Sequence, residues 1–298
     1  MIVATTIKTI VPYVTQSFVR YPDENSRIWI STRIELDKRN DMAVINGIDR
    51  QKTIPLSQMR FFKFMKIKRF LQAFQNKALP FMSPSTWYDA YDKHLYDAAF
   101  MSPMFQRIFC FCCSYSFAND TEAMWRMYGQ PWDTIVRVSM NFQNLLDSLN
   151  AFSRQKDLDI YVSLIDYSLE QKQIRGLVNR YANLPNVSIP EWISLMSLKR
   201  KAFSYEHEIR FSIVTHSDAT NTYINRDLFS CPVLCNNRPI VTQVTLPPID
   251  PSKKWLEDIA SILELQGYSQ KNTIAQTKAS LQNVVPTLVI KESKLYQW

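Results

Sequence analysis

The chain has 298 residues, a net charge of +8 and a hydrophobic content of 46%. The apolar side chains can supply a substantial core and argue against a disordered chain, while the positive charge makes an anionic partner plausible without identifying it. The 4 glycines stand far apart in the sequence. Nucleotide-binding folds of the Rossmann and P-loop types need clustered glycines where the backbone approaches phosphate. The sequence therefore argues against both folds.

The N-terminal part is predicted to form strands separated by polar turns, at residues 6–14, 26–36 and 42–48. A further strand is predicted over 59–66. It runs directly into a helix over 67–77, where apolar residues recur at helical spacing. We place a domain boundary here, with a β-rich extension at 1–58 and the main domain at 59–298.

From residue 107 onward, predicted strands and helices mix without regular alternation. The predicted strands cover 107–116, 133–140, 157–168, 201–214, 238–248 and 273–281. The predicted helices cover 119–129, 168–183, 191–201 and 251–267. Because the order is irregular, the α+β class is expected, with helices inserted around a mixed sheet.

The five cysteines are Cys110, Cys112, Cys113, Cys231 and Cys235. A chain of this size and apolar content does not need a disulfide framework, so reduced thiols and a cytoplasmic location are expected. A tetrathiolate zinc site is an alternative, but the spacing differs from the usual Cys-x2-Cys pairs, and no metal is predicted. Neither a secretory signal nor an apolar run of membrane-spanning length is recognisable, so no membrane association is expected.

Residues 57–88 contain no acidic side chain before Tyr88 and carry a cluster of cations among aromatic residues. Positive charges beside aromatic rings suit phosphates and stacked bases, so this segment is predicted to bind nucleic acid. The residues assigned to that role are Arg60, Lys66, Lys68 and Arg69. The neighbouring phenylalanines can equally belong to the core.

The segment 201–214 reads as a strand in which Glu206, Glu208 and Arg210 alternate with larger apolar residues. A side-chain period of two puts these three charged residues in one row on one face, with the two carboxylates about 7 Å apart. Such a row is either an exposed ladder that pairs with neighbouring cations or a reaction centre. The pattern alone leaves both interpretations open.

Several short motifs, taken in order, resemble a bacterial family of domains of unknown function. They are Lys63-Phe64, the loop "WYDAYD" at 87–92, "CFCCS" at 110–114 followed by "MWRMYG" at 124–129, and "YEHEIR" at 205–210. The resemblance covers roughly residues 59–282. It departs from the family at "WYDAYD", where the family usually has Asn-Asp-Pro, and at an extra cysteine before Ser114.

The family's architecture is similar to that of ADP-ribosyltransferases, so the resemblance implies a split mixed sheet that holds NAD without a glycine fingerprint. It implies that Glu208 is the catalytic acid and that Glu206 orients the acceptor or takes its proton. The residues expected to bind the cofactor are Lys63, Phe64, Ser83, Tyr88, Trp125, Tyr128 and Arg210. Trp125 and Tyr128 can also be core residues, and Arg210 would either hold a carboxylate in place or bind phosphate.

The resemblance implies an NAD-consuming ADP-ribosyltransferase that acts as a toxin or phage-defence effector. Single-stranded nucleic acid, with RNA favoured, is the expected acceptor, because exposed bases present exocyclic amines. The family also includes similarity to mRNA-modifying toxins of toxin–antitoxin–chaperone systems, which implies an antitoxin partner. The alternatives are a non-catalytic nucleic-acid-binding or assembly module, a nuclease that uses Asp89, Glu206 and Glu208 with Mg²⁺, and a plain NAD glycohydrolase.

Overall fold

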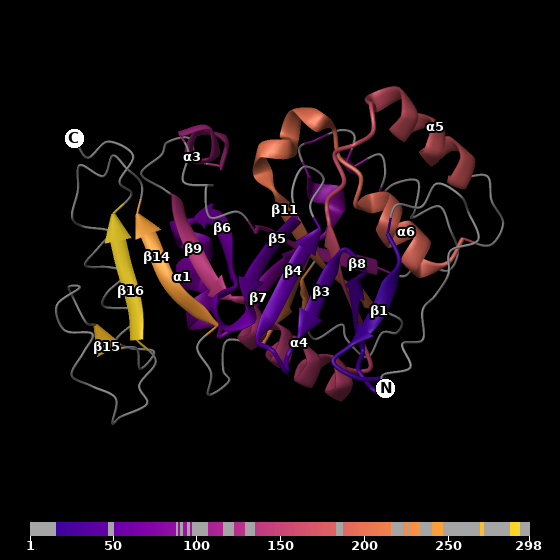
Figure 1. Cartoon of the computed structure of the whole chain (residues 1–298). Coiled ribbons are helices and arrows are strands. Elements are labelled where there is room, and N and C mark those ends of the chain that lie inside the picture. The colour runs from indigo at the N-terminus through magenta and orange to yellow at the C-terminus, as the bar shows by residue number, and fades with distance from the viewer. Residues whose placement is uncertain are drawn as a thin grey trace. The chain divides into compact units, whose positions relative to one another are not determined.

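The structure is a computed structural model of the whole chain (Figure 1). It describes residues 16–46, 51–87, 89, 92–93, 96, 107–115, 122–128, 135–182, 187–215, 223–225, 227–232, 240–246, 269–270 and 287–292. The chain divides into two compact units. The first comprises Met1–Leu56, Pro80–Cys112 and Asp147–Cys231, and the second comprises Ser57–Leu79, Cys113–Leu146 and Pro232–Trp298. The proposed boundary at residue 58 stays a prediction, and the first 56 residues group with later segments in the first unit.

The first unit contains a mixed sheet in the order β1-β2-β10-β11-β8. Its strands are β1 (Phe18–Tyr21), β2 (Ile28–Ser31), β10 (Asp159–Leu164), β11 (Glu208–Thr215) and β8 (Arg107–Ser114), whose last residues belong to the second unit. The β10–β11 and β1–β2 pairs are antiparallel, whereas β2 and β10 are parallel. All eight residues of β11 are buried, which explains why this strand has a nearly continuous apolar sequence.

A separate antiparallel sheet in the same unit has the order β3-β4-β5. Its strands are β3 (Ile34–Asp37), β4 (Met42–Asn46) and β5 (Gln51–Pro55). Three short strands complete the β structure: β7 (Leu79–Met82), β12 (Ile224–Asn225) and β13 (Leu228–Cys231). The predicted single strand over 26–36 is therefore two strands, β2 and β3, which belong to different sheets.

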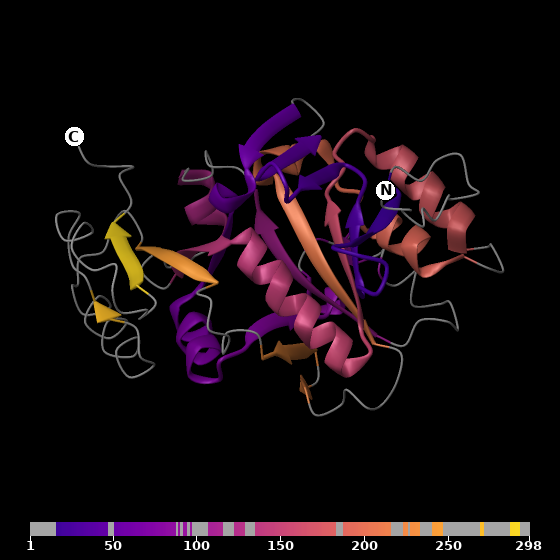
Figure 2. The same cartoon turned by 60° about the horizontal axis from the view of Figure 1, so that its bottom comes forward.

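The helices of the first unit are α5 (Gln171–Ala182), α6 (Ile189–Met196) and the 3-10 helix η4 (Lys201–Glu206). Figures 1 and 2 show α5 and α6 side by side, and the rings of Tyr181 and Trp192 meet between them at 6.3 Å. A capping box between Ser188 and Glu191 begins α6. Helix α4 (Phe142–Lys156) starts in the second unit, and its C-terminal part belongs to the first.

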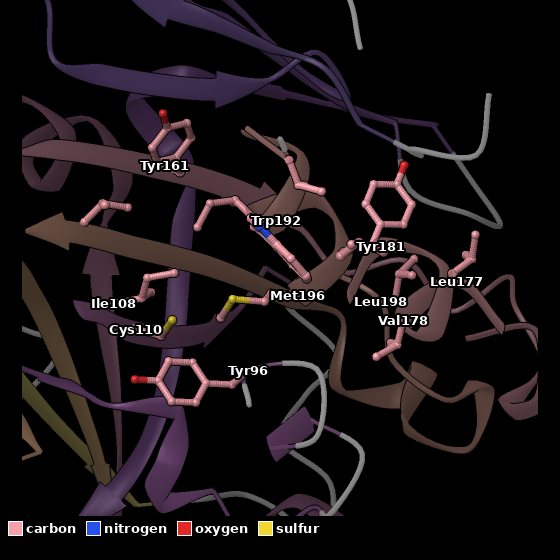
Figure 3. Close-up of a cluster of buried hydrophobic side chains, with 14 of the residues drawn as sticks. Tyr96, Ile108, Cys110, Tyr161, Leu177, Val178, Tyr181, Trp192, Met196 and Leu198 are labelled. Carbon is pink, nitrogen blue, oxygen red and sulfur yellow. The ribbon is translucent and has the colours of Figure 1, made fainter. Parts of the chain in front are cut away.

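The core of the first unit is built on aromatic and sulfur-containing side chains from β8, β10, α5 and α6 (Figure 3). Tyr161 on β10 lies between Phe18, at 5.4 Å in an edge contact, and Trp29, at 6.1 Å in a stacked contact. Cys110 and Met196 belong to the same cluster. Since α6 is packed into this core, the chain that leaves it at residue 197 starts from a fixed position.

The second unit contains the strand order β6-β9-β14-β16-β15. Its strands are β6 (Arg60–Lys66), β9 (Ile135–Asn141), β14 (Val241–Leu246), β15 (Ser269–Gln270) and β16 (Thr287–Glu292). Strands β6, β9 and β14 are antiparallel neighbours, and β14 pairs in parallel with β16, as Figure 2 also shows. Its helices are α1 (Ile67–Gln75) and α3 (Glu122–Tyr128). The mixture of parallel and antiparallel pairs confirms the expected α+β class.

Most predicted elements in the described residues are confirmed, including the strand-to-helix junction at 66/67. In α1, Ile67, Phe70 and Phe74 are buried, as their helical spacing predicted. The strand predicted over 201–214 is wrong in its first half, because residues 201–206 form η4. Strands β1, β5 and β16 were not predicted. The predictions for 6–14, 251–267 and 273–281 lie outside the described residues.

Candidate functional site

Five charged side chains gather in the first unit around the start of β11. Glu208 and Arg210 lie two residues apart on this strand, Glu206 ends the 3-10 helix before it, and Lys199 precedes that helix. Asp92 comes from the segment that follows the "WYDAYD" loop's first residues. None of the five is more than 10% exposed at its side chain. We call Asp92, Lys199, Glu206, Glu208 and Arg210 the charged cluster.

The two glutamates are brought together by a turn and not by a strand. His207, between them, adopts the left-handed conformation with φ 44°, and its N–H bonds the carbonyl of Ser204 at 3.2 Å. The expected spacing of two successive residues on one strand face is therefore wrong for Glu206, although it holds for Glu208 and Arg210. Because the chain turns at His207, both carboxylates reach the same lysine.

Lys199 bridges the two glutamates at short distances. Its Nζ lies 2.6 Å from Glu206 Oε2, 3.0 Å from Glu208 Oε2 and 3.7 Å from Asp92 Oδ2. An ammonium group has three N–H donors, so three carboxylates can share it. Lys199 Nζ also lies 5.0 Å from the centre of the Phe203 ring.

Arg210 holds the other side of Glu208. Its Nε and Nη2 both lie 2.8 Å from Glu208 Oε1, and Nη2 lies 3.7 Å from Asp92 Oδ2. Nη1 donates to the carbonyl oxygen of Met196, and the guanidinium stacks 4.4 Å from the Trp87 ring centre. Of the two roles expected for Arg210, contact with a carboxylate is present, and phosphate binding stays a prediction.

The burial of these groups removes the exposed-ladder interpretation of Glu206, Glu208 and Arg210. The residues are 4%, 5% and 2% exposed, and their charges are compensated inside the protein. Burying ionised groups is costly unless they are paired, so a cluster of this kind is uncommon without a role. Strongly perturbed titratable groups are concentrated at functional sites, although purely structural networks also perturb them.

The two glutamates have opposite pKa shifts. Burial and the neighbouring Glu208 charge raise the pKa of Glu206 to about 7, against a smaller opposing effect of Lys199. Burial also acts to raise the pKa of Glu208, but Arg210 and then Lys199 outweigh it and hold that pKa well below its usual range. Near neutral pH, one carboxyl is therefore ionised while its neighbour is close to half-protonation. Such a division suits one electrostatic role and one proton-transfer role.

Other side chains fix the surroundings of the charged cluster. The Tyr167 hydroxyl accepts the Glu208 backbone N–H at 3.1 Å, and Arg200 Nη2 lies 2.6 Å from Asp89 Oδ2. The thiol of Cys112 on β8 forms a hydrogen bond with the Glu208 carboxylate, which contributes to lowering its pKa. Asp89 is thus paired with an arginine, and each carboxylate expected in the nuclease alternative has a cation beside it.

Four of the residues expected to bind the cofactor belong to the second unit, and there they form a packed group. Phe64 makes an edge contact with Trp125 at 5.0 Å and stacks on Tyr128 at 5.7 Å. Trp125 is fully buried in a small core cluster, whereas Tyr128 is 42% exposed. Lys63 is half-buried on β6. Packing accounts for Trp125 in this structure, and the binding roles of all four stay predictions.

The remaining cofactor assignments are Ser83 and Tyr88. Ser83, in the first unit, is buried, and its Oγ accepts the N–H of Ser85 at 3.3 Å at the start of a 3-10 turn. This contact gives Ser83 a structural role, and its role toward a cofactor stays a prediction. Tyr88 lies outside the described residues.

The basic segment around α1 presents cations but not rings. Lys66, Lys68 and Arg69 are exposed, and Arg60 is half-buried with its Nη1 bonded to the carbonyl of Ser57 at 2.8 Å. The phenylalanines between them are all buried: Phe61, Phe62, Phe64, Phe70 and Phe74. They are core residues and are not available to stack on bases, so the stacking half of the nucleic-acid argument is wrong for these rings.

Two residues of the site were not predicted from the sequence, Lys199 and Tyr167. Lys199 lies in the basic run "LKRK" after α6, which reads as an ordinary solvated stretch. Tyr167 follows β10, and nothing in its neighbours marks it. Both depend on the pairing of segments distant in sequence, since the Asp166–Leu198 bridge brings their segments together.

Metal and membrane signals are absent from the described part of the chain. No group of three or more His, Cys, Asp and Glu residues suited to a metal ion occurs among the described residues. Cys110, Cys112, Cys113 and Cys231 are free thiols, while Cys235 lies outside the described residues. Within the same described residues, no helix is long and apolar enough to cross a membrane.

Comparison with known proteins gives one distant structural similarity. No family model matches the chain, and no curated protein matches it in sequence. A solved structure of Thermus sp. 2.9 DarT in complex with NAD+ is similar over 78% of this chain and 94% of that one, with 9% sequence identity and a TM-score of 0.32. A similarity at this level does not assign the chain to a family. The functional argument rests on the charged cluster.

Proposed function

We propose that the chain is an NAD-dependent ADP-ribosyltransferase that modifies a macromolecule and acts as a toxin or phage-defence effector. The observation that carries the enzymatic part is the buried pair of Glu206 and Glu208 on one lysine, with one carboxyl ionised and the other poised near neutrality. The motifs that resemble the ADP-ribosyltransferase-like family include this pair. The split-sheet architecture of that family remains part of the proposal.

The chemistry of the transfer fits two carboxyl groups with different charges. When the bond between nicotinamide and ribose breaks, its electron pair goes to the nicotinamide nitrogen and positive charge develops on the ribose. Glu208, ionised over the physiological range because Arg210 and Lys199 offset its burial, would stabilise that charge. The acceptor's oxygen or nitrogen then bonds to the anomeric carbon and releases a proton. Glu206, with a pKa of about 7, would take it.

We propose RNA as the preferred acceptor and a separate antitoxin as a partner. The support for a nucleic acid is electrostatic: the exposed cations around α1 and the net charge of +8. NAD is a substrate in this proposal, and the cofactor contacts of Lys63, Tyr128 and the other assigned residues belong to it. The antitoxin is inferred from the family resemblance alone.

The test is to incubate the protein with NAD labelled in its adenylate phosphate and to separate RNA, DNA and protein fractions. Wild type should label a polymer and release nicotinamide, with RNA labelled most. Glu208→Gln should reduce the label about 100-fold or more, the usual loss when one electrostatic partner of a transition state is removed. Glu191→Gln is the matched control, because Glu191 is also buried in the first unit but caps α6 through Ser188. Glutamine preserves such a cap.

The outcomes separate the alternatives. Intact NAD with no labelled polymer would overturn the transferase proposal, and so would full activity in Glu208→Gln. Nicotinamide release without polymer label would indicate a glycohydrolase. RNA cleavage that needs Mg²⁺ and ignores NAD would indicate a nuclease, and RNA binding with neither reaction would indicate a binding module.

A further inference from the structure

Lys199 occupies the centre of the charged cluster, although it is outside every motif that the sequence singles out. Its backbone is fixed on both sides: its N–H bonds the carbonyl of Asp166 at 3.0 Å, and the Asp166 N–H bonds the carbonyl of Ser197 at 2.7 Å. These bonds tie the chain between α6 and η4 to the end of β10. The ammonium group therefore reaches the glutamates from a rigid support, with only 10% of the side chain exposed.

The division of contacts between the two cations gives Lys199 a separate task. Arg210 contacts Glu208 and Asp92. Among the described residues, Lys199 is the one cation within ion-pair distance of Glu206. The cluster contains three carboxyl groups and two cations, so removing Lys199 would leave Glu206 buried beside the negative charge of Glu208 without compensation.

We propose that Lys199 is a positioning residue that holds Glu206 against Glu208 and keeps Glu206 able to accept a proton at neutral pH. This inference rests on the proposed function, because it assigns Lys199 to the proton-transfer half of that reaction. Lys199 does not touch the reacting atoms in this assignment. It acts through Glu206 alone, while Arg210 retains Glu208.

The groups that face Glu206 determine the direction of the effect. Besides Lys199 and Glu208 they are Tyr167, after β10, and Tyr205, on η4. Burial raises the pKa of both tyrosines, so they stay neutral and do not titrate in the range where Glu206 does. Only Lys199 lowers the pKa of Glu206 by its charge, so its removal must move that pKa upward.

The test compares wild type with Lys199→Gln in two measurements. The first follows the Glu206 carboxyl carbon by NMR between pH 5 and pH 9, with the signal assigned by its loss in Glu206→Gln. The inflection should move upward by about one pH unit or more, and each unit changes the protonation ratio tenfold. The second measures NAD turnover over the same range. Activity should fall about tenfold at pH 6 and recover toward the wild-type rate by pH 9.

Two further variants protect the test against misfolding. Lys199→Arg retains the positive charge and should keep the inflection close to the wild-type value. Lys199→Gln combined with Asp92→Asn removes one cation and one carboxylate, so the net charge of the cluster is unchanged. This double variant should still show the raised inflection even where the single variant does not fold.

Two results would overturn the role of Lys199. One is an inflection that stays in place when Lys199 is replaced, and the other is a loss of activity that is equal at every pH. A wild-type protein that leaves NAD intact would overturn the proposed function instead, and the NMR titration would then decide the role of Lys199 by itself.

Discussion

Replacing Arg210 with methionine measures how much the charged cluster depends on its buried guanidinium. Arg210 is 2% exposed, and two of its nitrogens lie 2.8 Å from the same Glu208 oxygen. Methionine retains much of the apolar stem but leaves Glu208 with Lys199 as its remaining ion-pair partner. Breaking a buried ion pair by removing one partner costs about 3–5 kcal/mol. Because Lys199 stays in place, we expect a loss near 3 kcal/mol at pH 7.

The assay is urea unfolding with linear extrapolation, and Arg154→Met is the matched control. Arg154 pairs with Asp23 at 2.8 Å, but the two side chains are 44% and 49% exposed. An exposed pair contributes about 0–1 kcal/mol, so the control should change little. The comparison therefore separates buried from exposed pairing of the same residue type.

The effect should also depend on pH. The folded-state pKa of Glu208 is depressed in wild type, so its stabilising contribution is present above its ordinary value of 4.5 and is lost as the pH falls. In Arg210→Met much of that contribution is missing, and protonation of Glu208 relieves the buried charge. The stability difference between wild type and variant should shrink from pH 7 to pH 4. Equal losses for the two arginine variants, or a difference that does not change with pH, would refute this reasoning.

Three other predictions concern single features. Glu206 has a folded pKa of about 7 against an ordinary 4.5, so stability falls as the pH rises through this window; Glu206→Gln should remove that fall in urea unfolding measured from pH 4.5 to 8. Burial raises the pKa of Cys110 to about 11, so peptide mapping after brief iodoacetamide treatment should find Cys112 alkylated well before Cys110. Replacing Lys68 and Arg69 with glutamine should lower the salt dependence of RNA binding by about 0.7 per lost contact, whereas the same change of charge on α5 should not.

The sequence predicted local structure well wherever one element decides its own pattern. The helical spacing of Ile67, Phe70 and Phe74 identified α1, and the period of two placed Glu208 and Arg210 on one face of β11. Such patterns depend on neighbours in the chain, which the sequence displays directly. The same reasoning predicted a reaction centre or an exposed ladder for this row without deciding between them. Burial decided it, and burial depends on the strands on either side.

The position of Glu206 shows where pattern reasoning fails. Alternation continues smoothly from Glu206 to Arg210 in the sequence, yet the strand begins only at Glu208 because His207 takes a left-handed conformation. Histidine carries no strong signal for that conformation, whereas glycine or asparagine would have suggested it. A turn of this kind changes which residues share a face, and so it changes which carboxylates share a cation.

Lys199 shows a second kind of limit, because its importance arises from contacts that are remote in the sequence. Nothing in "LKRK" separates this lysine from its solvated neighbours until the Asp166–Leu198 bridge brings its segment to the end of β10. There the same residue type that is usually exposed becomes the shared partner of Glu206, Glu208 and Asp92. A motif search finds the acids because their spacing is local. It misses the cation that sets their charges, since that cation is supplied by the fold, and substitutions at Lys199 are therefore as informative about the site as substitutions at the glutamates.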